Sequence, residues 1–145
     1  MDFVVKKFSD LSLTELYEVL RVRSQVFIVE KNMRCQDIDG VDHRALHFYI
    51  EDNGKILAYL RAFYYNDNND IIKIGRVLSA THGMGLGKDI MLKTIDYIKH
   101  NMKPKKIILD SQKSAIGFYE KFGFEVDSDE FLEEGVIHVK MKLKI

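Results

Sequence analysis

The chain has 145 residues, 46% of them hydrophobic, so it is expected to form a single domain, residues 1–145, with a sizeable core. Lysine plus arginine and aspartate plus glutamate both number 22, so no overall charge favours nucleic acid or an anionic membrane surface as a partner. Cys35 is the only cysteine, which excludes an internal disulfide, and no N-terminal apolar run indicates a signal peptide or membrane span; a cytoplasmic location is therefore expected.

The first half of the sequence predicts one strand, one helix and three antiparallel strands. A short strand at residues 3–8 precedes Ser12 and Glu15, which have the spacing of a capping box at the start of a helix. After a polar, irregular stretch at 30–44, strands at 46–51 and 55–65 flank the hairpin signal Asn53-Gly54, and a third strand follows at 71–78. The apolar face of the helix, expected to be core, consists of Leu13, Leu16, Tyr17, Leu20, Phe27 and Ile28.

The second half predicts strands and helices around a glycine-rich turn. From Leu86 the sequence has the period of an amphipathic helix, which ends near Pro104. A strand near residue 107, a short helix at 114–122 with Gly123 as its C-cap, and strands near 124–127 and 137–143 follow. The strand–helix–strand unit should be parallel, so a ligand crevice is expected at the ends of its strands. The fold class is therefore α/β, with a mixed sheet and helices on its faces.

The glycine-rich turn, residues 83–88, has the chemistry of a phosphate-binding site. A helix that starts near Gly85 leaves its first amide hydrogens unpaired, and its dipole places positive partial charge there. A Walker A loop would need glycine at His82 and Ser or Thr at Asp89, and a dinucleotide fingerprint would need glycine at Lys88 or Ile90. Both of these motifs are excluded, whereas a merely flexible strand-to-helix turn stays open.

A second motif downstream gives the turn a family context. Residues 107–112 (IILDSQ) and 115–124 (AIGFYEKFGF) form a strand, a helix with a tyrosine and a Gly-Phe exit. Together with the turn they resemble the acetyl-coenzyme A signature of the GNAT N-acetyltransferases. Residues 26–30 with 36–40, and 133–135 with His138, resemble the ElaA-like branch of that superfamily. With residues 74–77 the resemblance extends over most of the chain.

The resemblance implies a GNAT-like fold and an acyl donor. The fold would be a mixed, mostly antiparallel central sheet of six to seven strands with helices on both faces, and acetyl-CoA would be the donor. Two positions depart from the family pattern: His82 replaces the usual Gln or Arg of the turn, and Gln112 stands where Asn is frequent. The implied cofactor-binding residues are Val77, Leu78, His82, Gly83, Met84, Gly85, Leu86, Gly87, Lys88, Gln112 and Tyr119.

Acetyl transfer to an amine requires a base, a stabilised carbonyl oxygen and a protonated leaving thiolate. Tyr119 matches the family residue that protonates the thiolate, although Phe118, Tyr119 and Phe122 could also be only an aromatic patch. Glu30 is the candidate base. Arg76 is expected to pair with an acidic residue rather than with the cofactor. The candidate residues for binding the acceptor are Asp37, Asp39, His43 and Glu133.

Metal binding and covalent catalysis are weak alternatives. A calcium loop around Asp37 and Asp39 would place Cys35 and Leu46 at ligand positions, and Cys35, His43 and His47 lack the paired framework of a zinc site, so no metal is expected. Nothing near Cys35 indicates an activated, acyl-carrying thiolate.

The predicted function is acetyl transfer to a primary amine of a small molecule or peptide, by direct attack in a ternary complex. The alternative is a non-catalytic module that senses acyl-CoA, and His82 gives it some support. Neither nucleic acid nor membrane is expected as a partner, and the chain is expected to be a monomer or a homodimer.

Overall fold

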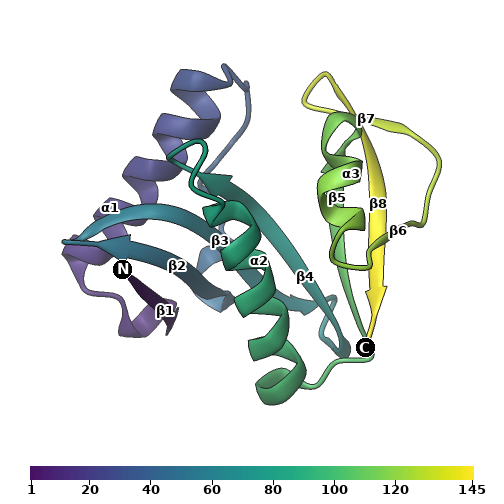
Figure 1. Cartoon of the computed structure of the whole chain (residues 1–145), viewed down its shortest axis with the longest axis horizontal. Coiled ribbons are helices and arrows are strands. Elements are labelled where there is room, and N and C mark those ends of the chain that lie inside the picture. The colour runs from purple at the N-terminus through teal and green to yellow at the C-terminus, as the bar shows by residue number, and fades with distance from the viewer.

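The centre of the fold is one eight-stranded sheet with the order β1-β2-β3-β4-β5-β8-β6, in which β7 pairs with β8 (Figure 1). The computed structural model describes residues 1–145, except for the side chain of residue 68. Strands β4 and β5 are parallel, and the other paired neighbours are antiparallel, as the sequence predicted. The strands are β1 (Asp2–Lys7), β2 (Leu46–Asp52), β3 (Lys55–Tyr65), β4 (Asn68–Ser79), β5 (Lys106–Gln112), β6 (Glu125–Val126), β7 (Phe131–Glu133) and β8 (Val136–Lys144).

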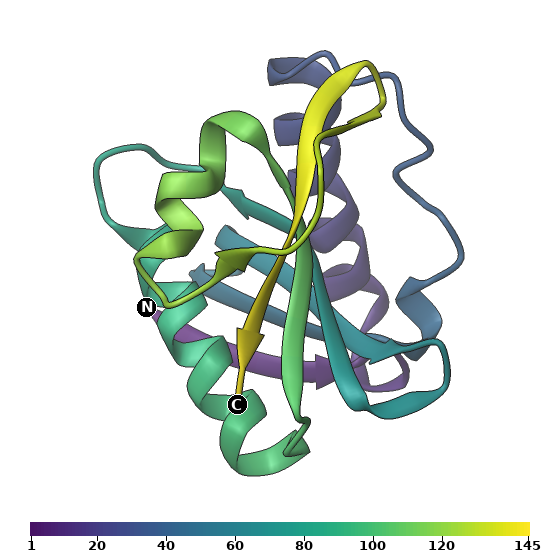
Figure 2. The ribbon, with the colours of Figure 1, turned by 90° about the vertical axis from the view of Figure 1, so that its right-hand side faces the viewer.

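Helices cover both faces of this sheet, which confirms the predicted layers. Helix α1 (Leu13–Arg23) lies on one face, and α2 (Leu86–Tyr97) and α3 (Ile116–Glu120) lie on the other (Figure 2). The predicted apolar face of α2 is confirmed, because Ile90, Met91 and Ile95 are buried in the main core. Each such side chain removed from water contributes about 1.5–3 kcal/mol.

The predicted buried face of α1 is wrong in part. The capping box is present, since the Glu15 amide donates to Ser12 Oγ over 3.1 Å and the Ser12 amide donates to Glu15 Oε1 over 2.8 Å. Leu13 and Tyr17, however, are 87% and 76% exposed, and Ile28 also lies at the surface. The sheet instead covers a stripe that consists of Val19 and Val22 of α1 and continues with Val26 of the π-helical segment η2 (Ser24–Glu30). Of the predicted residues, Phe27 is buried in the same cluster.

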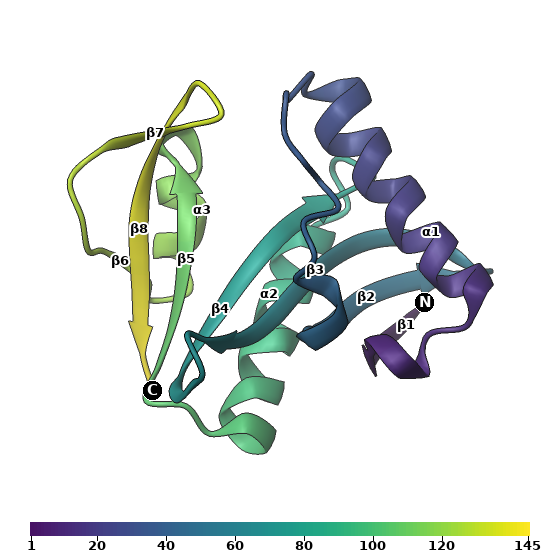
Figure 3. The same ribbon diagram turned by 180° about the vertical axis from the view of Figure 1, so that it is seen from behind.

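Strands β4 and β5 separate after a short paired section. They pair only at residues 71–73 with 106–108, and beyond that point β5 pairs with β8 while β4 stays with β3 (Figures 1 and 3). A bulge bends β4 in the same region, because Arg76 and Val77 both lie opposite Leu60, and Arg76 has a φ of +55°. The gap opens at the carboxyl ends of both parallel strands, where the sequence predicted a crevice.

Candidate active site

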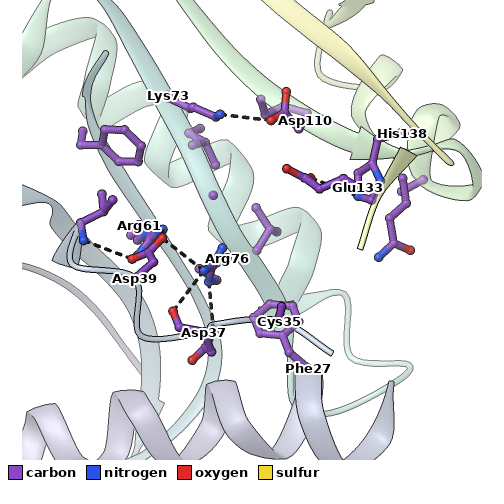
Figure 4. A pocket seen from close by; sticks show the side chains of 18 of the residues that line it. Phe27, Cys35, Asp37, Asp39, Arg61, Lys73, Arg76, Asp110, Glu133 and His138 are labelled. Carbon is purple, nitrogen blue, oxygen red and sulfur yellow. Dashed lines mark hydrogen bonds and ion pairs between the residues drawn. The ribbon is translucent and has the colours of Figure 1, made fainter. Parts of the chain in front are cut away.

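A cavity of about 390 Å³ fills the gap between β4 and β5 (Figure 4). Residues of β3, β4, β5, α3, the β7–β8 hairpin and the segment 31–41 all contribute to its walls. The lining residues are Phe27, Lys31, Cys35, Asp37, Asp39, Val41, Arg61, Phe63, Lys73, Ile74, Gly75, Arg76, Val77, Leu109, Asp110, Gln112, Ala115, Tyr119, Glu133 and His138.

The cavity joins the two faces of the sheet. In strand β5, Leu109 is part of the main core beneath α2 and α3, so Asp110 and Gln112 point to the face that carries α1. Tyr119 and Ala115 reach the cavity from the α3 side, whereas Asp37 and Asp39 reach it from the α1 side. Two molecules could therefore approach one another through the gap from opposite faces.

The glycine turn forms the start of α2 on the α2 and α3 face. Gly85 is the N-cap residue, with a φ of +70° and no side-chain cap, and Gly83 has a φ of +79°. The first helical bond runs from the Asp89 amide to the Gly85 carbonyl over 3.1 Å, so the amides of residues 86–88 precede it without helical partners. Such a helix start attracts an anion through these amides and through its dipole.

Helix α3 lies between this turn and the cavity. An added β-carbon at Gly87 would lie 3.6 Å from the Phe118 ring, so the first turn of α2 packs directly on α3. On the same helix Tyr119 is buried against Phe118 and Phe124, with ring centroids 5.1 and 6.1 Å away. The two interpretations of Tyr119 are thus compatible, because it belongs to an aromatic cluster and also lines the cavity.

The hydroxyl of Tyr119 is available as a proton donor. Among the described residues it makes no hydrogen bond, and burial raises the pKa of Tyr119 to about 12. The phenol therefore stays protonated at neutral pH.

Three arginines fasten segment 31–41 and Asp42 to the rest of the fold. Arg23, which is 0% exposed, donates from Nε to Asp37 Oδ2 over 3.1 Å and from Nη1 to Asp42 Oδ1 over 2.7 Å. Arg61 also contacts Asp42, at 2.9 Å. Arg76 donates to Asp37 over 2.9 Å, which confirms that it pairs with an acidic residue.

These contacts keep the acids of the segment ionised. Burial opposes ionisation of Asp39, but hydrogen bonds from Arg61 and from the Val41 amide outweigh it and hold the pKa of Asp39 well below its usual range. Burial likewise opposes ionisation of Asp42, and the bonds from Arg23 and Arg61 again lower its pKa. Asp37 and Asp39 thus have arginine partners already, which reduces what they can offer to a cationic acceptor.

The hairpin of β7 and β8 places a histidine and a glutamate on the opposite wall. His138 is 5% exposed, and its Nδ1 lies 2.8 Å from the Val136 carbonyl oxygen. Its Nε2 lies 3.6 Å from Glu133 Oε2, and its ring stacks on Phe131 with centroids 6.0 Å apart. Both side chains line the cavity across from Arg76 and Asp37 (Figure 4).

The structure separates the predicted site residues into two groups. Asp37, Asp39, Val77, Gln112, Tyr119 and Glu133 line the cavity. The turn residues His82, Gly83, Met84, Gly85, Leu86, Gly87 and Lys88 lie outside the lining, at the start of α2. Leu78 is also absent from the lining, and its side chain packs in the core beside α1.

Two residues that the sequence predicted for base catalysis and acceptor binding, Glu30 and His43, lie outside the cavity. Glu30 is exposed at the end of the π-helical segment η2 (Ser24–Glu30), where Gln25 Nε2 donates to its Oε1 over 3.4 Å. His43 is also exposed and packs on the Phe8 ring, with centroids 4.5 Å apart. Neither is among the residues that line the cavity.

Sequence reasoning missed a charged pair in the wall. Lys73 of β4 donates to Asp110 of β5 over 3.1 Å, and Lys140 lies 3.4 Å from the other carboxylate oxygen. The sequence held a signal for it, because Asp110 alternates with the apolar residues of an otherwise buried strand.

No group of His, Cys, Asp and Glu in the described part of the chain is arranged to hold a metal ion. His47, a zinc candidate, instead contacts the Tyr59 hydroxyl at 2.7 Å and the Asp42 carbonyl oxygen at 3.0 Å. No described helix has the length and hydrophobicity needed to span a membrane.

Comparison with known proteins decides the family. Residues 13–145 match the acetyltransferase (GNAT) domain. The chain belongs to the GNAT acetyltransferase family. The predicted ElaA-like branch is confirmed too, because Escherichia coli protein ElaA is 33% identical over 141 residues, which are 94% of this chain and 92% of ElaA. A UPF0039 protein of Schizosaccharomyces pombe is 32% identical over 149 residues, which are 100% of this chain and 98% of that protein.

Solved structures of similar proteins agree with this membership. A crystal structure of an acyl-CoA N-acyltransferase from Pseudomonas aeruginosa has a TM-score of 0.91 at 30% identity, covering 98% of this chain and 99% of that one. The crystal structure of E. coli ElaA has a TM-score of 0.90 at 32% identity, covering 97% of both chains. This GNAT protein is therefore an enzyme of the N-acetyltransferase class, and acyl transfer from an acyl-CoA is its general chemistry.

Proposed function

We propose that the protein moves an acetyl group from acetyl-CoA to a primary amine of a small molecule or peptide, by direct attack in a ternary complex. The observation that carries the proposal is the cavity between β4 and β5, whose walls include residues from both faces of the sheet. On one face lie the open helix start and Tyr119. On the other lies the part of the cavity lined by Asp37, Asp39, Glu133 and His138, which we call the acceptor chamber. Direct transfer needs such an arrangement, because donor and acceptor must be present together.

The donor would lie along the α2 and α3 face. The amides of residues 86–88, opened by Gly83 and Gly85, would hold the pyrophosphate, with His82 and Lys88 beside it. The pantetheine arm would then enter the gap and reach the edge of β4 at Val77 and Leu78, with Gln112 contacting it from the α1 side of the cavity. Beyond residue 73 this edge has no pairing with β5, so a peptide N–H there could stabilise the developing charge on the thioester oxygen.

Tyr119 would protonate the leaving sulfur. Tyr119 lines the cavity, and the raised pKa of its hydroxyl, about 12, keeps the proton in place until a thiolate forms nearby. Cys35 also lines the cavity, but burial raises the pKa of its thiol, which disfavours the thiolate that a covalent route would need.

The acceptor would enter on the α1 face. Asp37, Asp39 and Glu133 lie there, and of these Glu133 has no arginine or lysine partner among the described residues. A cationic amine that enters the chamber would therefore find its least compensated carboxylate at Glu133. The lining has four basic side chains (Lys31, Arg61, Lys73 and Arg76) and four acidic ones (Asp37, Asp39, Asp110 and Glu133), so it carries no excess of negative charge that would favour a polycation over a single amine group.

Two measurements on the purified protein test the proposal. Isothermal titration calorimetry should show one CoA bound per chain. A colorimetric assay for free thiol should then show CoA release from acetyl-CoA in the presence of at least one amine from a panel of polyamines, amino sugars, amino acids and lysine peptides. Binding without release from any acceptor would instead indicate the acyl-CoA sensor, and the absence of binding by folded protein would overturn the donor site.

A further inference from the structure

We infer that His138 is the base that removes the proton from the acceptor amine, and that Glu133 is the positioning residue that supports it. The inference rests on the proposed function, because it assigns a role within the same site. It replaces Glu30, which lies outside the cavity.

The ring orientation of His138 is fixed in a way that suits a base. A carbonyl oxygen can only accept a hydrogen bond, so the contact of 2.8 Å to the Val136 oxygen requires the proton of the neutral ring to be on Nδ1. The lone pair is then on Nε2, which is the nitrogen directed toward Glu133 and the cavity. Stacking on Phe131 holds the ring in this plane.

Glu133 is placed to stabilise the proton once His138 has accepted it. Its Oε2 lies 3.6 Å from Nε2, and its side chain is 49% exposed, so it can approach the ring as charge develops there. The other carboxylates of the lining already have partners: Asp110 of β5 contacts Lys73 and Lys140, Asp37 contacts Arg76, and Asp39 contacts Arg61. Glu133 is therefore the carboxylate that remains for the imidazole.

The location of His138 on the sheet matches the acceptor side. In the β5–β8 register His138 lies opposite Gln112, and Lys140 lies opposite Asp110, so these side chains share the face that carries α1. Val139 and Met141 point the other way, into the core beneath α3. The histidine thus faces the acceptor chamber, whereas Tyr119 of α3 reaches the cavity from the other face of the sheet.

The reaction balances with these two groups. The acceptor enters as an ammonium ion and gives one proton to His138 Nε2. The neutral nitrogen then attacks the thioester carbon, the C–N bond forms, and the C–S bond breaks as the sulfur takes the Tyr119 proton. The second nitrogen proton returns to Tyr119 through solvent, and His138 releases its own proton to solvent, so free CoA and the amide remain.

The test compares His138→Asn with wild type, using an amine that the wild-type protein acetylates. Asparagine can still donate to the Val136 carbonyl oxygen but cannot take up a proton. We expect kcat/KM for the amine to fall about 100-fold or more at pH 7, while the Kd of acetyl-CoA stays within about twofold. In the wild type, kcat/KM should decrease at low pH because the base becomes protonated, and this decrease should be absent from the variant.

Glu133→Gln is the second variant, and Glu134→Gln, at the tip of the same hairpin but outside the cavity lining, is its matched control. Without the Glu133 carboxylate, protonated His138 loses a stabilising negative charge nearby. The decrease of kcat/KM at low pH should therefore begin at a lower pH than in the wild type. Glu134→Gln should leave it in place. This pair keeps the inference testable even if His138→Asn does not fold.

Nitrogen-15 NMR of the imidazole supplies a measurement that does not need turnover, and a neutral ring protonated on Nε2 would overturn the assignment. An His138→Asn variant with wild-type rate and an unchanged pH profile would overturn it as well. Wild-type protein that acetylates no amine would instead count against the proposed function, so the two failures can be told apart.

Discussion

At the scale of single residues, the charges around the acceptor chamber are the least expected feature. Arg23 is completely buried where α1 continues into the π-helical segment η2, a position at which a sequence pattern would place an aliphatic residue. It is tolerated because Asp37 and Asp42 neutralise it and accept its hydrogen bonds. Removing one member of such a group leaves a buried charge without a partner.

Arg23→Met should therefore lower the free energy of unfolding by about 3–5 kcal/mol, as urea titration would measure it. Arg21→Met is the control on the same helix. The Arg21 side chain is largely exposed and pairs with Glu18 three residues away, so its loss should cost less than about 1 kcal/mol. Equal losses in the two variants would show that the buried group contributes no more than a surface pair.

The aspartates of this group predict a dependence of stability on pH. Asp39 and Asp42 have lower pKa values folded than unfolded, where about 3.9 is usual, so the unfolded chain binds more protons in acid. Their contribution is complete above about pH 5 and is lost as the pH falls through the folded values. Urea titrations between pH 2 and 7 should show this loss, with a smaller pH dependence in Asp39→Asn; an identical slope would contradict it.

Tyr119 offers a residue-scale test on the donor side. Tyr119→Phe keeps the ring packed on Phe118 and Phe124 and removes only the hydroxyl. If that hydroxyl protonates the thiolate, kcat should fall about tenfold to 100-fold while the Kd of CoA changes less than threefold. An unchanged kcat would restrict Tyr119 to packing.

At the scale of elements, the start of α2 shows how backbone geometry leaves the amides of a helix open to an anion. Gly85 adopts a left-handed conformation that costs other residues roughly 1–2 kcal/mol, and it aims the first-turn amides outward. Nothing lies within 4 Å of the position of a β-carbon there, so any effect of a substitution is conformational rather than steric.

Gly85→Ala should accordingly lower the free energy of unfolding by about 1–2 kcal/mol and weaken CoA binding about fivefold or more, as measured by calorimetry. Gly117→Ala is the matched control, because Gly117 lies within α3 and also has open space around it. That change should stabilise the protein by about 0.5–1 kcal/mol and leave the affinity unaltered. A full-affinity Gly85→Ala protein would argue against a phosphate at this helix start.

The elements also show where prediction from sequence succeeds. The hairpin at Asn53-Gly54, the amphipathic α2 and the capping box at Ser12 were predictable, because turn chemistry and helical period are local signals. The bulge at Arg76 was not, since an arginine with a φ of +55° is stabilised by Asp37 and Asp39, which lie almost 40 residues earlier in the chain. The short strand β7 was missed for a similar reason, because it exists only through pairing with β8.

For the candidate site, too, the sequence identified some residues and not others. The glycine turn and Tyr119 belong to compact motifs, so the sequence located them directly. On the acceptor side, however, residues come from segments that only the folded chain brings together, such as Arg61, Lys73 and Asp110. Glu30 and His43 are exposed and lie outside the cavity, but nothing in the sequence distinguished them from the polar residues that line it.

At the scale of the whole molecule, the separation of β4 from β5 is the feature that organises everything else. One sheet continues through the paired section, and the open end accommodates the cavity. A ligand that binds in the opening should reduce local unfolding of the backbone on both sides of it, because the ligand binds only to the folded form.

Hydrogen exchange followed by mass spectrometry can check this expectation. Saturating acetyl-CoA should slow exchange at residues 74–79 and 86–89, and it should leave α1 nearly unchanged. Protection at α1 alone, with none at the start of α2, would place the ligand on the other face of the sheet.

The open end of the sheet also affects the order in which substrates can bind and products can leave. Because residues from both faces of the sheet line the cavity, the acyl donor and the acceptor would each enter from its own face. Neither would need to wait for the other before entering, and spent CoA could depart while the acetylated amine remains. A bulky amine, even a lysine on the surface of a large protein, would then never compete with the nucleotide for the same exit.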